Sequence, residues 1–249
     1  MDFLLCIYAF ISFGVGFPAS ALFLRCGLEA SLHFSPRTAI ELATLSSLSG
    51  ALALLLIRGP TSVPCKQRAL CMGPAFVGGC IGQALLLMFS ARFPGSITLA
   101  RLQIVPLFLF TIAALLTRIS ECFSLNSRRL LLISLLCSLI DGFFGAGGLI
   151  LFSLFTTGGV KRRQQIPSCA LLVTCISRAS ALLLILLTGE AQLLPSRMVI
   201  AVAAGSAAGA VLWAYKNERG TLAKGLRTAL TVYLVLAAAS CAEQAITAG

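Results

Sequence analysis

Long apolar runs separated by short polar or basic stretches make up almost the whole chain. A helix needs about 20 predominantly apolar residues to cross the hydrocarbon core of a membrane. The runs also lack the strict alternation of apolar and polar residues that marks a transmembrane barrel. We therefore expect an all-α, polytopic bundle of about eight spans. They are predicted at residues 3–24, 38–57, 70–90, 97–116, 130–156, 166–187, 196–215 and 221–246.

The first and fifth segments differ from the others. No basic residue precedes residues 3–24, and the run is longer than the apolar core of a typical signal peptide, so we interpret it as a retained first span. Residues 130–156 form a stretch of 27 residues with glycines in its middle. This fifth segment fits either one long helix or two half-helices.

Composition agrees with a membrane protein and excludes an ordinary soluble one. Of the 249 residues, 58% are hydrophobic and 11% are charged, with a mean hydropathy of +0.98; soluble domains are about 25% charged. The apolar runs leave no room for a soluble domain of roughly 100 residues. The sequence therefore predicts a multi-pass protein of the cell (inner) membrane, surrounded by lipid; a homo-oligomer is compatible with it.

An internal repeat connects the two halves of the chain. Gly14-Val15-Gly16 recurs as Gly145-Ala146-Gly147, and the G-x-x-x-G pair Gly78/Gly82 recurs as Gly205/Gly209. Such pairs let helices cross closely. We predict one membrane domain made of two repeats, residues 1–120 and 121–249, which is typical of secondary transporters.

The net charge of +11 arises from basic groups spread between the apolar runs. That pattern excludes a nucleic-acid partner, which would require a basic stripe, and it indicates topology signals instead. With eight spans, ten basic residues, Arg25 among them, fall on the side of the loops after spans 1, 3, 5 and 7, and seven fall on the other side. By the positive-inside rule both termini would then face outward.

Cysteine and histidine give no sign of a metal site or a cofactor. The ten cysteines include no C-x-x-C pair and mostly lie within apolar runs, where they act as small hydrophobic residues. The single histidine, His33, is predicted in a loop. An intramembrane enzyme would need a catalytic set, and the spans contain no Asp-Asp pair and no H-E-x-x-H sequence. We therefore expect no enzymatic activity.

The segment around Asp141 is the most informative part of the chain. Its sequence, Asp-Gly-Phe-Phe-Gly-Ala-Gly-Gly, places a carboxylate and four glycines within a membrane span. Asp at a helix centre costs about 3 kcal/mol in membrane insertion, and each helical glycine costs about 1 kcal/mol relative to alanine. A broken helix here would expose backbone N–H groups that bind an anion beside the carboxylate. Alternatively, the glycines form a packing face, and Asp141 caps a broken helix or pairs with an arginine.

At this motif, Asp141, Gly142, Phe143, Phe144, Gly145 and Gly147, the chain resembles the sulfite exporter TauE/SafE family of membrane transporters. The likeness continues through Ala170, Ser177 and Gly189 to Gly205 and Gly209. The first repeat keeps Gly14 and Gly16 but has no acidic residue nearby. The resemblance implies transport of sulfite, sulfonates or related organic anions, coupled to protons.

Two further charged residues lie within predicted spans. Thr38, Glu41, Thr44 and Ser49 form a polar stripe, and Glu41 is a candidate proton carrier unless it lies near the interface or pairs with an arginine. Arg178 shares a face with Thr174 and Ser177, and its guanidinium suits anion oxygens. Arg178 could equally pair with Asp141 or Glu41. Arg101, four residues into its span, is predicted to reach the membrane interface.

Taken together, these observations predict a secondary transporter for a small anion, working by alternating access between the repeats. A channel or a non-transporting membrane partner is the second hypothesis, and an intramembrane enzyme is the third. The predicted substrate-site residues are Asp141, Gly142, Gly145, Gly147, Gly148, Ser177, Arg178, Gly14 and Gly16. The predicted proton-coupling residues are Asp141 and Glu41.

Overall fold

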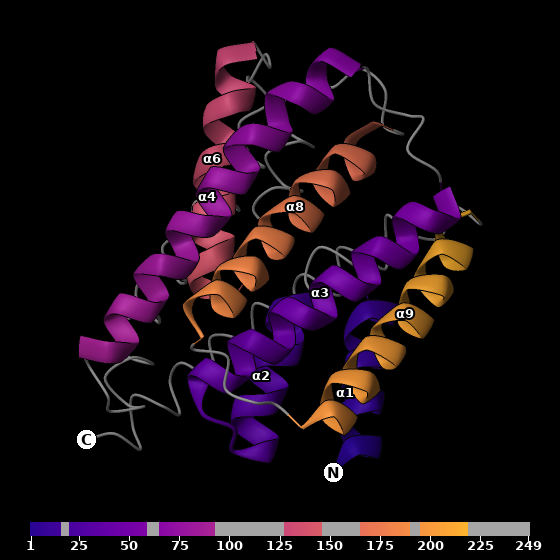
Figure 1. The fold of residues 1–249 in the computed structure, drawn as a ribbon. Coiled ribbons are helices and arrows are strands. Elements are labelled where there is room, and N and C mark those ends of the chain that lie inside the picture. The colour runs from indigo at the N-terminus through magenta and orange to yellow at the C-terminus, as the bar shows by residue number, and fades with distance from the viewer. Residues whose placement is uncertain (16–19, 59–64, 93–126, 146–164, 190–194, 219–249) are drawn as a thin grey trace.

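The computed structural model describes residues 1–15, 20–58, 65–92, 127–145, 165–189 and 195–218 (Figure 1). These residues form helices and no strands, which confirms the predicted all-α class for this part of the chain. The helices are α1 (Asp2–Val15), α2 (Ser20–Leu32), α3 (Pro36–Arg58), α4 (Cys65–Arg92), α6 (Ser127–Phe144), α8 (Gln165–Thr188) and α9 (Ser196–Glu218).

Four of the helices are long and apolar enough to cross a membrane. Their apolar parts are Arg37–Ile57, Leu70–Arg92, Leu171–Thr188 and Ser196–Tyr215, in α3, α4, α8 and α9. They match the predicted segments 38–57, 70–90, 166–187 and 196–215. The predicted spans at 97–116 and 221–246 lie outside the described residues, as does Arg101. The protein is therefore a helical membrane protein.

The first predicted span is wrong as a single helix. Residues 3–24 are divided between α1 and α2, because α1 ends at Val15 and α2 begins at Ser20. The intervening sequence contains Gly16 and Pro18, and proline lacks the N–H that a helix interior needs. Gly27 of α2 lies against Tyr8 of α1, so that α2 returns along α1 as the second arm of a helical hairpin.

A tight turn then leads from α2 into α3. Phe34 N donates to Leu28 O at 3.1 Å, and His33 has a positive φ of 52°, so the helix ends with a residue in the left-handed conformation that glycine more often adopts. Ser35 caps the next helix, since its Oγ accepts from Thr38 N at 3.2 Å. The exposed His33 is a loop residue, as predicted.

Three helices run in one direction through one side of the bundle. Gly205 of α9 lies against Cys6 of α1 and Gly209 lies against Phe10, so α1 and α9 are parallel. Two apolar clusters connect them to α3: the early residues of α3 and α9 share one cluster, and the late residues share the other. Helices α1, α3 and α9 therefore all begin at the same end of the bundle.

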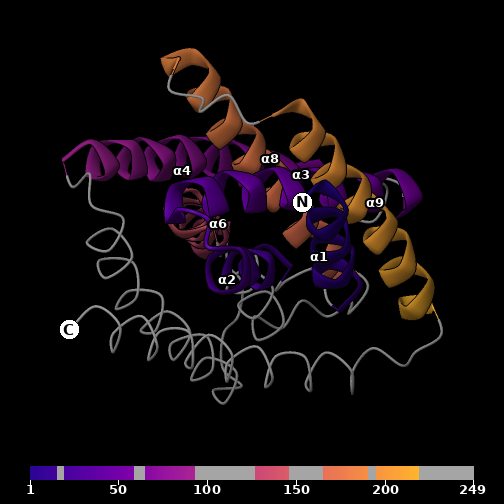
Figure 2. The same cartoon turned by 90° about the horizontal axis from the view of Figure 1, so that it is seen from below.

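Helices α4, α6 and α8 run in the opposite direction. Gly78 of α4 lies against Leu135 of α6 and Gly82 lies against Leu139, so α4 and α6 are also parallel. Ile40, early in α3, packs with Leu86, late in α4. Helix α8 is likewise antiparallel to α3, because late residues of α3 cluster with early residues of α8. Viewed from below, α4 and α6 lie at one side and α1 and α9 at the other (Figure 2).

Both G-x-x-x-G pairs are helix crossings, as the sequence predicts. A Cβ on Gly78, Gly82 or Gly205 would overlap a backbone carbonyl of the facing helix. The crossings connect opposite halves of the chain, since α4 packs most extensively on α6 and α1 on α9. The two halves are thus interleaved and form one body.

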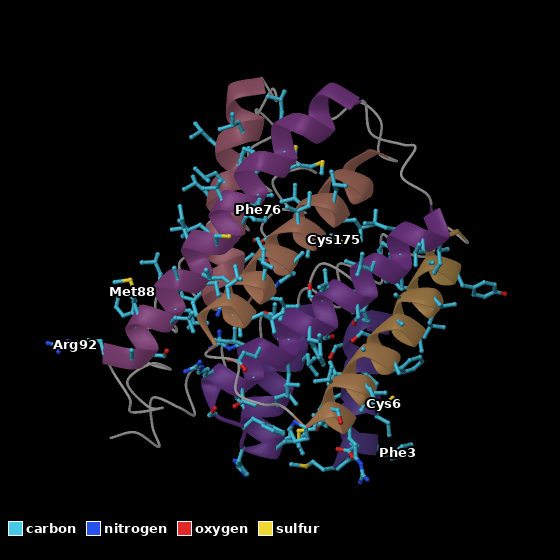
Figure 3. The ribbon with its side chains drawn as sticks, in the orientation of Figure 1. Phe3, Cys6, Phe76, Met88, Arg92 and Cys175 are labelled. Carbon is cyan, nitrogen blue, oxygen red and sulfur yellow. The ribbon has the colours of Figure 1, made fainter. Side chains whose placement is uncertain are left out.

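Large apolar side chains point away from the bundle. Phe76 and Met88 project from the outer side of α4, where they are 44% and 68% exposed (Figure 3). Inside, the fully or nearly fully buried polar residues are mainly hydroxyls. They include Ser12, Thr44, Ser46, Ser47, Ser134, Ser138, Thr174, Ser177, Ser180 and Ser206. An apolar exterior around a small, hydroxyl-rich interior is what helix packing in lipid favours.

Candidate functional site

A buried ion pair occupies the place where α3, α6 and α8 meet. Arg178 Nη2 of α8 donates to Asp141 Oδ1 of α6 at 2.6 Å, and Nη1 donates to Thr44 Oγ1 of α3 at 2.8 Å. Both charged residues have 0% of their surface exposed. The sequence left open whether Arg178 pairs with Asp141 or with Glu41, and the structure shows Asp141.

Helix α6 ends beside this pair. Gly145 has φ +72°, and its N–H donates to Asp141 O at 2.9 Å, which closes the end of the described helix. Glycine is favoured in this conformation, because a side chain beyond Cα adds strain there. A Cβ on Gly145 would lie 3.8 Å from Arg178 Nη1, so the helix end is next to the guanidinium. Of the two alternatives that the sequence left open for residues 130–156, the structure excludes one unbroken helix, because α6 ends at Phe144; residues 146–156 lie outside the described residues.

A second buried arginine, Arg25 of α2, contacts the end of α6. Arg25 of α2, 5% exposed, donates from Nη1 to Phe144 O at 2.6 Å and from Nε to Glu29 Oε1 at 2.7 Å. The C-terminus of a helix carries partial negative charge, which cations stabilise. The positive charges of Arg25 and Arg178 therefore offset the partial negative charge of the helix end and the charge of the Asp141 carboxylate.

Sequence reasoning missed Arg25. The sequence places Arg25 in a loop after the first span. In the structure it lies inside α2, a helix that the sequence did not predict. The count of ten basic residues against seven is therefore wrong, because it includes Arg25 among the loop residues. Arg25 and Glu29 stand four residues apart on one helix face, the spacing of a helical ion pair. That spacing was the available signal.

Several buried polar atoms of α6 and α8, the helices that carry the pair, make no hydrogen bond within the described residues. They are Arg178 Nε, Thr174 Oγ1 and Ser138 Oγ. Arg178 and Thr174 lie one turn apart on α8, so a guanidinium donor and a hydroxyl point from the same helix face. Buried donors usually have partners, and each exception requires an explanation. A bound anion is one explanation, since its oxygens accept from both groups.

Glu41 belongs to a different pair. Arg37 Nε donates to Glu41 Oε1 at 3.2 Å, and the carboxylate is nearly buried while Arg37 is partly exposed. The structure therefore shows the arginine pairing that the sequence allowed. Of the polar stripe on α3, Thr44 is the member that bonds to Arg178; Thr38 bonds to Ser35, and Ser49 bonds to the carbonyl of Ser46.

The other predicted site residues fall into two groups. Gly14 and Gly142 lie in helix crossings: a Cβ on Gly14 would meet Leu212 at 3.3 Å, and one on Gly142 would meet Gly79 O at 2.7 Å. Ser177, beside Arg178, donates to Ser138 O at 3.3 Å. For these three residues contact with a substrate stays a prediction. Gly16, Gly147 and Gly148 lie outside the described residues.

The described residues contain no group of three His, Cys, Asp or Glu side chains that could hold a metal ion. Comparison of the chain with family models, with curated proteins and with solved structures finds no match.

Proposed function

We propose that the protein is a secondary transporter for a small anion, with Arg178 as the anion-binding group and Asp141 as its resident counter-ion. The observation that carries the proposal is a fully buried arginine whose Nε makes no bond within the described residues and whose other nitrogens bond to α3 and α6. A guanidinium presents paired donors that match the oxygens of sulfite, sulfonate or carboxylate.

The energetics of the pair support a functional role. Removing two charges from water costs several kcal/mol per ion, and their attraction does not reliably repay it. Hydrophobic residues of equal volume would fill the space at lower cost. Ionisable residues inside a membrane therefore mark a solute or proton pathway by default.

The course of the helices supports alternating access between two repeats. We propose that residues 1–120 and 121–249 are inverted repeats, in which α1, α3 and α4 correspond to α6, α8 and α9. Each proposed counterpart runs in the opposite direction. Each first helix also crosses the third helix of the other half through a G-x-x-x-G pair. Transporters with inverted repeats bind solutes near the midplane, where discontinuous helices end.

The resemblance to the TauE/SafE transporters suggests the substrates: sulfite, an organosulfonate or a related carboxylate. It also suggests coupling to protons. Asp141 suits a proton carrier in such a cycle, because protonation of its carboxyl would release Arg178 for the incoming anion. Glu41 is the second candidate, with Arg37 as the group to be released.

Flux into proteoliposomes tests the proposal. The purified protein would be assayed with sulfite, methanesulfonate and acetate, with and without an imposed pH gradient. Arg178→Lys keeps the charge but loses the planar fork, and the loss of one charged hydrogen bond, about 1.5–3 kcal/mol, should lower flux roughly 10- to 100-fold. Arg92→Lys, at an exposed arginine at the end of α4, is the matched control.

Asp141→Asn should remove the dependence of flux on the pH gradient, and Glu41→Gln shows whether the second carboxyl contributes. Asp2→Asn is the control for loss of an acidic residue. Saturable flux that Arg178→Lys leaves unchanged would overturn the assignment of the site. Conductance without saturation would show a channel instead.

A further inference from the structure

We infer that α1 and α6 are half-length helices that enter the membrane from opposite faces, and that the end where α6 begins faces the cytoplasm. This inference concerns topology and does not depend on transport. It rests on helix length, on helix direction and on the distribution of basic residues.

Length separates the helices into two groups. The apolar parts of α1 and α6 are Asp2–Gly14 and Leu131–Phe144, whereas the four long helices have apolar parts of 18 to 23 residues. At 1.5 Å per residue the two short parts reach about 20 Å, which is less than the roughly 30 Å of a hydrocarbon core.

The directions of the helices show that the chain does not reach the far face of the membrane through α1. Helices α1 and α3 both run parallel to α9, so both start at the same end of the bundle. The chain must return between them, and α2 does so, with Gly27 against Tyr8. The turn at His33 to Ser35 therefore lies on the same side as Met1. Helices α1 and α2 form a re-entrant hairpin.

Helix α6 repeats this arrangement from the other end. It runs parallel to α4 and so begins where α4 begins, and it ends at Gly145 beside the buried pair. Helix α8, which is antiparallel to α3, begins at that same end again. Asp141 stands ten residues beyond Leu131, or about 15 Å along the helix. That distance places the ion pair near the midplane of the membrane.

The helix directions in the structure change which basic residues lie at the same end of the bundle. We call the end at which α3 and α9 finish and α4, α6 and α8 begin the basic end. Its helix termini contain Arg58, Lys66, Arg68, Arg128, Arg129 and Lys216. The opposite end of the described helices has Arg37, Arg92 and Arg197. Figure 3 shows Arg92 at the lower end of α4, on the left, and Phe3 of α1 near the bottom of the view, on the right.

The sequence next to these helices strengthens the difference. Lys161, Arg162 and Arg163 come two to four residues before the first residue of α8 in the sequence, and Arg219 directly follows α9. The eight-span prediction placed these four residues on the face opposite to Arg58, Lys66 and Arg68, because it counted the fifth segment, residues 130–156, as a crossing. Lysine and arginine near short loops stay on the cytoplasmic side. The basic end is therefore cytoplasmic, and Met1 lies on the outer side.

Two native lysines test this without any substitution. Intact cells expressing the full chain would be treated with a membrane-impermeant amine reagent, followed by mass spectrometry, with permeabilised cells as the control. We expect Lys66 and Lys216 to be modified only after permeabilisation. In an eight-span protein with its N-terminus outside, these lysines face opposite sides, and Lys66 would react in intact cells. Modification of both lysines in intact cells would overturn the orientation.

Epitope tags provide an independent measurement of the hairpin. One tag would precede Met1 and a second would be inserted between His33 and Phe34, in separate full-length chains. Antibody should reach both tags in intact cells. A tag at His33 that becomes accessible only after permeabilisation, while the tag at Met1 is accessible before it, would show that the chain crosses the membrane once between Met1 and His33, as a single span at residues 3–24 would. A tag after Gly59 should be accessible only in permeabilised cells.

Discussion

The two half-length helices share a scaffold but differ in chemistry. In α1, Phe10 O faces Gly209 of α9, and two residues later Ser12 is buried with its hydroxyl bonded to Tyr8 O. In α6, Leu139 O faces Gly82 of α4, and two residues later stands Asp141. Ser12 and Asp141 thus hold matching positions in matching crossings, yet only Asp141 is charged. The two helix crossings therefore pack in the same way, but only the α6 crossing contains a buried charge.

The largest expected difference comes from truncating these matching residues. Asp141→Ala would leave the Arg178 charge buried without its carboxylate, and loss of one partner of a buried pair costs about 3–5 kcal/mol in stability. Ser12→Ala removes one hydroxyl bond, worth about 1 kcal/mol. Denaturant unfolding in detergent would measure both. Equal losses would show that the buried pair is not intact in the folded protein.

The second largest loss of stability is expected from substitution of Arg25. Arg25→Gln removes the cation from Phe144 O and from Glu29, and hydrogen bonds to charged groups contribute about 1.5–3 kcal/mol. We expect Arg25→Lys to recover part of that loss, because the positive charge at the end of α6 returns. The midpoint of thermal unfolding reports both variants. Full stability in Arg25→Gln would contradict the contact between α2 and α6.

The crossing glycines test the symmetric part of the comparison. Gly82→Ala and Gly209→Ala each place a methyl group against the backbone of the facing helix, and such overpacking costs about 1–3 kcal/mol. The losses should be similar in the two halves. Gly73→Ala is the control within α4, since a Cβ there has open space, and helix propensity favours alanine over glycine by about 1 kcal/mol. Loss of stability in one half alone would break the symmetry.

The smallest effect concerns the contact between α3 and α9. Ser46 Oγ and Ser206 Oγ lie 2.6 Å apart, and both are fully buried. Interhelical hydroxyl bonds in membrane proteins contribute about 0.6 kcal/mol on average. Ser46→Ala and Ser206→Ala should each lower stability by about that amount, and the double variant should lose less than the sum. Additive losses would mean that the two hydroxyls do not interact.

Much of the scaffold could be predicted from the sequence, because apolar length and small-residue spacing are local properties. Helices α3, α4, α8 and α9 match predicted spans, and the pairs Gly78/Gly82 and Gly205/Gly209 are packing contacts as expected. The first span could not be predicted correctly. Hydropathy records how long an apolar run is, but not whether the chain turns back within it.

The residues of the candidate site could be predicted from the sequence, but the contacts between them could not. Asp141 and Arg178 are conspicuous because charges are rare inside spans. Which carboxylate Arg178 meets depends on which helices face each other, and no single-chain pattern contains that information. Thr44 belonged to a recognised polar stripe, yet its bond to Arg178 follows from the antiparallel packing of α3 and α8.

The interleaving of the halves has a consequence for synthesis on the ribosome. Helix α4 is followed by its partner α6 after a short interval, since Arg92 ends the one and Ser127 begins the other. Helix α1 ends at Val15, and its partner α9 begins 181 residues later, at Ser196. Because the ribosome adds roughly 5–20 residues per second, α1 lacks the helix that covers its packing face for about 10–40 s. Chains interrupted before Ser196 will present that face to chaperones and to the proteases that remove unfinished membrane proteins.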